Sequence, residues 1–349
     1  MQIRGRPRIL IVRLSSLGDV IQSVPVLNAL RDHFPQAHIS WVIRGRPADL
    51  LQGHKALDEL IVLPPNWLLR PQEWWRLYCR LRELAPNVCV DVQCLAKTSV
   101  VSLMSGAHWR IGIDGRFGRE FSRWINNTLV LPTKAHAVDQ YLELLRPLGI
   151  KDPRARFDLP DFPAEATTVA AFLRRHGLED DFVLLNPGAS WASKRWPPER
   201  FALVASYLRD TRRLRSVVLW AGQEEKAWAE EIVQKASSEA LLAPPTNLRE
   251  LASILRRARL FVGSDTGPLH LAAAVDTSCV GLFGPMPADR CGPYGPGHIA
   301  LQKVPPSGSH GMRRNASNET MCVITVEDVI AACDAVLSRQ PCSPQKRCA

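Results

Sequence analysis

Short apolar runs that alternate with helical patterns constrain the fold of this chain more than any other feature. Arg8–Leu14 is typical of a buried strand, and Asp19–Phe34 has helical apolar spacing and ends just before Pro35. Further strands are predicted over Ile39–Ile43, Leu60–Leu63 and Val88–Val92. Strands separated by helices are typical of parallel βαβ units. We therefore predict an α/β fold whose first half is one doubly wound sheet.

The same pattern restarts after the proline-containing segment Asp152–Pro163. Strands are predicted over Phe182–Asn186, Ser216–Trp220, Leu260–Val262 and Val280–Phe283. Because 349 residues exceed what one hydrophobic core usually serves, we expect two domains, at 1–160 and 161–325. We also expect a helix over 326–338, which either stays with the second domain or crosses back to the first. A disordered tail is expected over 339–349.

Composition points to a chain without a membrane span and with an anionic partner. The net charge of +10 and the pI near 9.4 favour binding to phosphates, acidic lipid or nucleic acid. No nucleic-acid motif accompanies the charge, so we expect no nucleic-acid partner. Nine scattered cysteines without a Cys-x-x-Cys pair indicate free thiols in a reducing compartment and argue against zinc. No apolar run approaches the roughly 18 residues that a bilayer span needs, which predicts a cytoplasmic protein.

The standard phosphate-binding fingerprints are missing. The chain has neither Gly-x-x-x-x-Gly-Lys-[Ser/Thr] nor a Gly-x-Gly-x-x-Gly after a strand, which disfavours an ATPase and a dinucleotide-dependent dehydrogenase. An Asp-x-Asp pair, which often holds a metal and a diphosphate, is also missing. We expect no cofactor and no metal, so protein groups must neutralise any bound diphosphate.

The segment Gly263–His270 offers such groups, because it joins a strand to a helix. Gly267 allows a tight turn, and Pro268 suits the first helical turn. Backbone N–H groups at this helix start would face a diphosphate, while Asp265 would accept from a sugar hydroxyl. The same residues also fit an ordinary helix cap with a core histidine at His270.

Two further groups follow strands of the second half. Lys194 comes after the turn Asn186–Ser190 and would act as a point charge on a phosphate, although alone it fits a solvated surface lysine. Glu225, or Glu224 beside it, would accept hydrogen bonds from ribose or sugar hydroxyls. An acid in the first turn of a helix is also ordinary.

In the first half, Asp19 follows the first strand and opens the first helix. There it would take a proton from an acceptor hydroxyl, with Ser15, Ser16 and Gly18 shaping the loop. The alternative is an acid that only stabilises the helix dipole. The stretch Trp67–Ala85 predicts an amphipathic helix that either rests on an anionic membrane, grips an acidic acceptor or is simply half-buried.

Taken in order, these pieces resemble glycosyltransferase family 9, the bacterial lipopolysaccharide heptosyltransferases. The resemblance extends to about Leu337 and is carried by Ile9–Val20, Asn186–Ser190, Lys194–Pro197, Gly222–Glu225, Gly263–His270 with the following alanines, and Gly284-Pro285 with Gly292–Gly295. Arg119-Glu120 and His136–Asp139 resemble the enzyme that adds the first heptose.

The resemblance implies a GT-B fold, with two facing Rossmann-like domains and a cleft between them. It implies inverting, metal-independent transfer of heptose from ADP-L-glycero-D-manno-heptose to Kdo-lipid A, at the inner face of the cytoplasmic membrane. Asp19 would be the general base, and Lys194 would stabilise the leaving diphosphate. The implied substrate-binding residues are Ser15, Ser16, Gly18, Ser190, Glu225, Asp265, Thr266, Gly267, Leu269 and His270. A transfer without metal fits the bottom-up interpretation, because a lysine and helix ends must then absorb the charge that develops on ADP.

Two rival interpretations stay open. One is a transferase of the same fold with another nucleotide sugar or acceptor, since one scaffold hosts many sugars. The other is a GT-B protein without catalytic activity that holds an acidic glycolipid.

Overall fold

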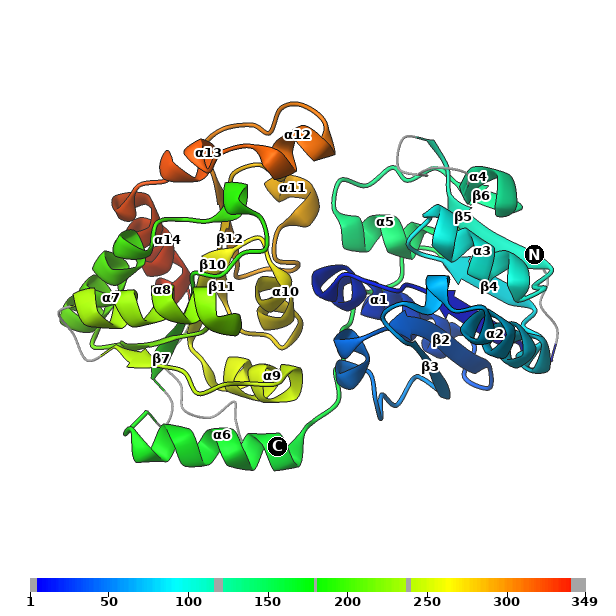
Figure 1. The fold of residues 1–349 in the computed structure, drawn as a ribbon, viewed down its shortest axis with the longest axis horizontal. Coiled ribbons are helices and arrows are strands. Elements are labelled where there is room, and N and C mark those ends of the chain that lie inside the picture. The colour runs from blue at the N-terminus through cyan, green and yellow to red at the C-terminus, as the bar shows by residue number, and fades with distance from the viewer. Residues whose placement is uncertain (1–4, 116–121, 179–180, 237–239, 340–349) are drawn as a thin grey trace. The chain divides into compact units, whose positions relative to one another are not determined.

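The structure, a computed structural model, describes residues 5–115, 122–178, 181–236 and 240–339 (Figure 1). It contains two compact units, Met1–Pro160 and Asp161–Ala349. Arg119-Glu120 and residues 340–349 of the expected tail lie outside the described residues.

A six-stranded, fully parallel sheet forms the centre of the first unit. Its strand order is β3-β2-β1-β4-β5-β6 (Figure 1). The strands are β1 (Arg8–Val12), β2 (His38–Arg44), β3 (Glu59–Leu63), β4 (Val88–Asp91), β5 (Trp109–Ile113) and β6 (Thr128–Val130). The predicted strands of this half are confirmed, whereas β5 and β6 were not predicted.

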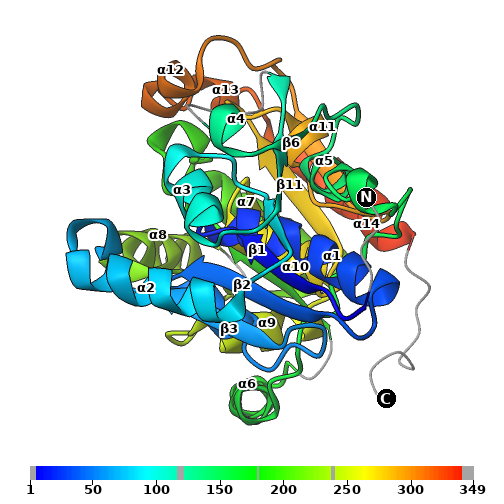
Figure 2. The same ribbon diagram turned by 90° about the vertical axis from the view of Figure 1, so that its right-hand side faces the viewer.

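Helices complete the first unit. They are α1 (Leu17–His33), α2 (Pro71–Leu84), α3 (Ala96–Met104), α4 (Ser122–Ile125) and α5 (Ala137–Glu143), with short 3-10 turns η1 (Arg46–Leu50), η2 (Trp67–Leu69) and η4 (Arg146–Leu148). Helix α1 starts two residues before the predicted Asp19, because Ser16 caps it. Leu77 and Leu81 of α2 pack on Leu10 and Val42 of the sheet in one buried cluster. Figure 2 shows α2 alongside β2 and β3.

The second unit repeats this design. Its parallel sheet has the order β12-β11-β10-β7-β8-β9. The strands are β7 (Phe182–Asn186), β8 (Arg215–Val218), β9 (Leu241–Leu242), β10 (Leu260–Ser264), β11 (Cys279–Phe283) and β12 (Ile299–Gln302). The predicted strands are present, and the two short edge strands β9 and β12 are additional.

The helices of the second unit enclose a large apolar core. They are α6 (Pro163–Arg175), α7 (Pro198–Arg212), α8 (Gly222–Lys235), α9 (Leu248–Arg257), α10 (Gly267–Ala274), α11 (Ala288–Cys291), α12 (His310–Asn315), α13 (Glu319–Cys322) and α14 (Val326–Ser338), with the 3-10 turn η5 (Ala192–Lys194). Val329, Cys333 and Val336 of α14 are buried in the same cluster as Phe201 and Val204 of α7. The last helix therefore belongs to the core of this unit.

Both sheets share one strand order. Numbered along the chain within its own unit, each is 3-2-1-4-5-6, the order of the Rossmann fold. In such sheets ligands bind outside the carboxyl ends of the strands, where the order reverses. That place lies between β1 and β4 in the first unit and between β7 and β10 in the second.

Candidate functional site

The carboxyl ends of β7 and β10 bring together two motifs that lie far apart in the sequence. Gly263 pairs with Asn186 in register. The Asn186 amide donates to the Gly188 carbonyl oxygen at 3.1 Å and lies 3.5 Å from the Thr266 hydroxyl. The turn after β7 and the turn after β10 are thus held against each other at the point where the strand order reverses.

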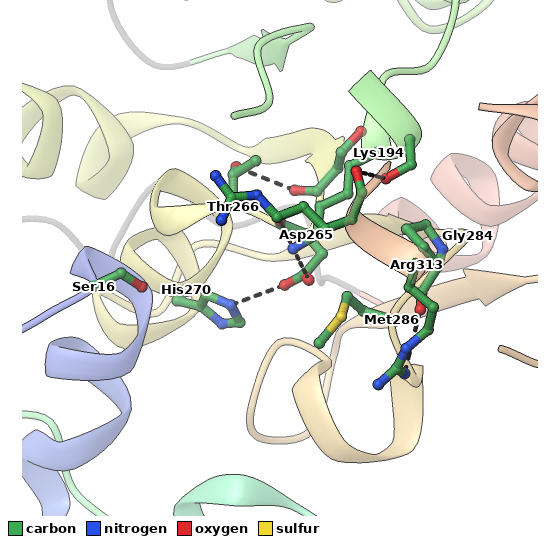
Figure 3. A network of polar contacts seen from close by, with 12 residues as sticks. Ser16, Lys194, Asp265, Thr266, His270, Gly284, Met286 and Arg313 are labelled. Atoms are coloured by element: carbon green, nitrogen blue, oxygen red, sulfur yellow. Dashed lines mark hydrogen bonds and ion pairs between the residues drawn. The ribbon is translucent and has the colours of Figure 1, made fainter. Parts of the chain in front are cut away.

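A buried charged network occupies this edge of the sheet. The Lys194 ammonium contacts Asp265 Oδ2 at 2.6 Å and donates to the Asp265 carbonyl oxygen at 3.2 Å. His270 Nε2 lies 3.2 Å from the other carboxylate oxygen, Oδ1. Figure 3 shows the three side chains linked through Asp265. The predicted residues Lys194, Asp265 and His270 therefore form one cluster.

The electrostatics of the cluster keep Asp265 ionised. Burial alone would raise the pKa of Asp265, but the hydrogen bond from His270 and the charge of Lys194 outweigh burial, and the pKa lies below its usual value. Trp191 gives Lys194 a second contact, because the ammonium lies 4.5 Å from the centroid of its ring. Sequence reasoning did not identify Trp191, since an aromatic residue three positions before a lysine has no recognised signature.

The start of α10 has the predicted shape. Thr266 is the N-cap residue, and Pro268 lies in the first turn. The first N–H groups of a helix have no partner within it, so the amide of Gly267 is available to an anion at this edge. Leu269 differs from Gly267, because the Leu269 side chain is fully buried and its N–H donates to the Thr266 carbonyl oxygen at 3.1 Å. Its side chain thus packs in the core.

Glu225, rather than Glu224, faces this edge. A Cβ added to Gly188 would lie 2.3 Å from the Glu225 carboxylate, so glycine at position 188 leaves room for the acid where it lies. Burial raises the pKa of Glu225, and its Oε2 accepts from the Ala221 N–H at 2.8 Å. Glu224 is 66% exposed and pairs with Arg195 at 3.0 Å. Ser190 lies exposed on the same turn as Gly188.

In the first unit, Asp19 is held from two sides. Its Oδ2 accepts from the N–H and the hydroxyl of Ser16, at 3.0 and 2.8 Å, which completes a capping box at the start of α1. Its Oδ1 contacts the Arg13 guanidinium at 2.6 Å. The side chain is 39% exposed, next to Ser15 and the buried Gly18. Asp19 thus caps the helix and also presents a carboxylate at the carboxyl end of β1.

Arg13 is a positioning residue that sequence reasoning missed. It is 5% exposed, donates to the Val92 carbonyl oxygen at 3.2 Å, and lies over the ring of Tyr141 at 5.2 Å. The neighbouring N–H of Leu14 donates to Gln93 at 2.9 Å. An arginine that ends an otherwise apolar strand is the sequence signal that was available. These contacts fix the direction in which Asp19 points.

No group of three or more His, Cys, Asp or Glu side chains in the described part of the chain is placed to hold a metal ion. Every cysteine that the structure describes is a free thiol, whereas Cys342 and Cys348 lie outside it. Within the described ranges, no helix combines the length and the apolar character that crossing a bilayer requires.

Comparisons with known proteins agree with this geometry. The sequence model described as glycosyltransferase family 9 (heptosyltransferase) matches residues 74–320. The lipopolysaccharide heptosyltransferase 1 of Pseudomonas aeruginosa is 29% identical over 309 residues, which cover 84% of this chain and 83% of that protein.

Two solved structures show the same fold. The family 9 glycosyltransferase of Veillonella parvula superimposes with a TM-score of 0.80 at 24% identity, over 96% of this chain and 98% of that one. Escherichia coli heptosyltransferase WaaC, solved with ADP-2-deoxy-2-fluoro heptose, gives a TM-score of 0.72 at 21% identity, over 94% and 99%. The predicted GT-B fold is confirmed. With a family match across most of its length and a Rossmann-like sheet in each unit, this chain belongs to glycosyltransferase family 9 and is a glycosyltransferase.

Proposed function

We propose that this enzyme transfers heptose from ADP-L-glycero-D-manno-heptose to the Kdo-lipid A inner core of lipopolysaccharide, with inversion and without a metal. The family match and the heptosyltransferase relatives support the sugar. The observation that carries the proposal is the set of groups at the carboxyl edge of the second sheet. Lys194 offers a cation to the diphosphate of a nucleotide sugar, and the start of α10 offers backbone amides. Glu225 offers a hydrogen-bond acceptor.

In the proposed reaction the acceptor hydroxyl oxygen attacks the anomeric carbon of the heptose. The bond from that carbon to the β-phosphate oxygen breaks, and its electron pair leaves with ADP. Asp19 takes the hydroxyl proton, because its carboxylate is 39% exposed at the carboxyl end of β1 and is held there by Ser16 and Arg13. Lys194 and the Gly267 amide stabilise the charge on the departing diphosphate. Asp265 and Glu225 hold sugar and ribose hydroxyls, Ser15, Ser16 and Gly18 shape the acceptor side, and Ser190 borders the donor.

We also propose that the enzyme works on the cytoplasmic face of the inner membrane. The surface formed by η2 and α2 supports this, because Leu69 and Trp75 are 83% and 67% exposed. Arg70, Arg76 and Arg82 belong to the same stretch of chain and are exposed as well. Apolar side chains flanked by arginines suit the boundary of an anionic bilayer.

The first test is a donor screen with Kdo-lipid A, scored by release of the nucleoside diphosphate. ADP-heptose should release ADP, and Asp19→Asn should lower transfer about 10²- to 10⁴-fold because the base is lost. The affinity of Asp19→Asn for ADP should stay within about twofold of the wild-type affinity, because Asp19 is proposed to contact the acceptor and not the donor.

Asp210→Asn, which changes an exposed carboxylate on α7, is the matched control and should transfer normally. Turnover of another nucleotide sugar in place of ADP-heptose would end the heptose proposal. Binding of ADP without turnover of any donor would favour a glycolipid-binding protein, and full activity of Asp19→Asn would remove Asp19 from the mechanism.

A further inference from the structure

The segment that contains α12 is attached to the Lys194 turn. The Ser193 hydroxyl donates to the Arg314 carbonyl oxygen at 3.4 Å, and the ring of His310 meets that of Trp191 edge to face at 5.0 Å. Farther along, the Asn318 amide donates to the Arg195 carbonyl oxygen at 3.0 Å. Trp191 is also the ring that contacts the Lys194 ammonium. The segment is therefore built onto the wall of the candidate donor site.

The same segment also reaches the carboxyl end of β11, which neighbours β10 in the sheet. Arg313 Nη1 lies 3.4 Å from the Pro285 carbonyl oxygen, and Figure 3 shows the side chain beside Met286 and Gly284. A Cβ on Gly284 would lie 2.8 Å from the Met321 sulfur, so glycine allows this close approach. Arg313 therefore lies at the same edge of the sheet as Asp265 and Lys194, one strand farther along.

The charges at this edge are nearly balanced without Arg313. Lys194 is paired with Asp265 at 2.6 Å, and Arg195 with Glu224 at 3.0 Å, while Glu225 adds a further carboxylate. A diphosphate that leaves without a metal develops negative charge that these pairs do not offset.

Arg313 is a further cation at this edge of the sheet, and it takes part in neither of these ion pairs. No carboxylate in the described part of the chain pairs with its guanidinium, and the only hydrogen bond of its side chain there is the long contact with Pro285. Its Nε is buried and has no partner among the described residues, although the residue as a whole is only half-buried. A guanidinium presents a rigid fork of donors that matches phosphate oxygens, so it can bind one without giving up an ion pair.

We infer that Arg313 is a donor-binding residue, which contacts the β-phosphate of the nucleoside diphosphate and assists Lys194 as that phosphate leaves. The inference rests on the proposed function only in taking a nucleoside diphosphate as the ligand, and it does not depend on the identity of the sugar. It assigns a role to the α12 segment, which no sequence motif singled out.

Calorimetric titration of the full-length protein with ADP and with AMP tests the assignment. Arg313→Gln should weaken ADP binding roughly 10- to 100-fold, as expected for loss of a charge-assisted hydrogen bond. AMP lacks the β-phosphate, so its affinity should change less than about threefold and the preference for ADP over AMP should collapse. Arg313→Lys, which keeps the charge but not the fork, should fall between the wild type and Arg313→Gln.

Arg314→Gln is the matched control, because it removes a neighbouring exposed arginine and should leave both affinities unchanged. An unchanged preference for ADP in Arg313→Gln would overturn the inference, and so would equal weakening of ADP and AMP, which indicates general disruption. A thermal melt of each variant shows that it is folded. A wild-type protein that binds neither nucleotide would instead refute the proposed function.

Discussion

Asp265 divides its two carboxylate oxygens between Lys194 and His270, and this division fixes where the lysine points. The motifs in the sequence placed all three residues after strands, and the structure groups them. The ion pair itself could not be predicted, because 71 residues separate its members and only the parallel pairing of β7 with β10 brings them together. Arg313 was missed for a related reason, since the residue that its side chain contacts, Pro285, lies 28 positions away. Trp191 and Arg13 were missed because no recognised motif marks either position.

Glu225 should make nucleotide binding sensitive to acid. Burial raises the pKa of its carboxyl above the usual 4.5. A carboxylate that accepts from ribose hydroxyls does so above its pKa and loses that capacity as pH falls through it. ADP affinity, measured by calorimetry from about pH 7.5 down to about pH 5, should therefore weaken more in the wild type than in Glu225→Gln.

The phosphates of ADP titrate in the same way in both experiments. The difference between the wild-type and Glu225→Gln curves of ADP affinity against pH therefore reports the titration of the Glu225 carboxyl alone. Glu224→Gln changes the adjacent exposed acid and should follow the wild-type curve. Parallel curves for the wild type and Glu225→Gln would exclude Glu225 as a donor ligand.

At the scale of elements, a continuous apolar run decided which strands were predictable, and the half-exposed edge strand β3 was predicted because Leu60–Leu63 is such a run. The central strands β1, β4, β7 and β10 are buried and have continuous apolar runs, as expected when helices cover both faces of a sheet. The edge strands β6, β9 and β12 are short and half-exposed. An interior strand, β5, was missed because Arg110 and Gly112 interrupt its apolar run. Pairing with neighbours, rather than local sequence, defines these strands.

The η2–α2 surface leads to a prediction about membranes. Replacing both Leu69 and Trp75 with serine removes two exposed apolar side chains, each worth about 1.5–3 kcal/mol when buried in the bilayer boundary. Co-sedimentation with vesicles of phosphatidylethanolamine and phosphatidylglycerol should therefore drop at least about tenfold. Transfer to a short-chain, water-soluble acceptor should stay near normal.

Leu203→Ser serves as the control, because Leu203 is 58% exposed on α7 of the other unit. It should bind vesicles like the wild type, and phosphatidylcholine vesicles should bind the wild type more weakly. Equal vesicle binding by the double variant and the wild type would contradict the proposal, and loss of a dimer in sedimentation would identify the surface as a contact between copies.

At the scale of the whole molecule, each unit has a buried apolar cluster among its described residues. Leu10 lies in a cluster of the first unit and Leu282 in that of the second, and both side chains are fully buried. Truncating either leucine to alanine should cost about 2–5 kcal/mol. Because ADP is proposed to bind the second unit, saturating ADP should raise the melting transition that Leu282→Ala lowers, but not the one that Leu10→Ala lowers.

Differential scanning calorimetry of the two variants, with and without ADP, measures the shift in each melting transition that ADP causes. A single transition that ADP raises equally in both would show that the two units unfold together, and would contradict independent cores.

The contact between Gly188 and Glu225 has a consequence for anyone who wishes to redirect the enzyme to other nucleotide sugars. Since any side chain at position 188 meets the carboxylate of residue 225, the two positions form one coupled unit. Saturation libraries that randomise position 188 alone will mostly sample variants in which the Glu225 carboxylate has shifted. Randomising both together, so that a shorter residue at 225 accompanies a larger one at 188, opens combinations that stepwise directed evolution does not reach.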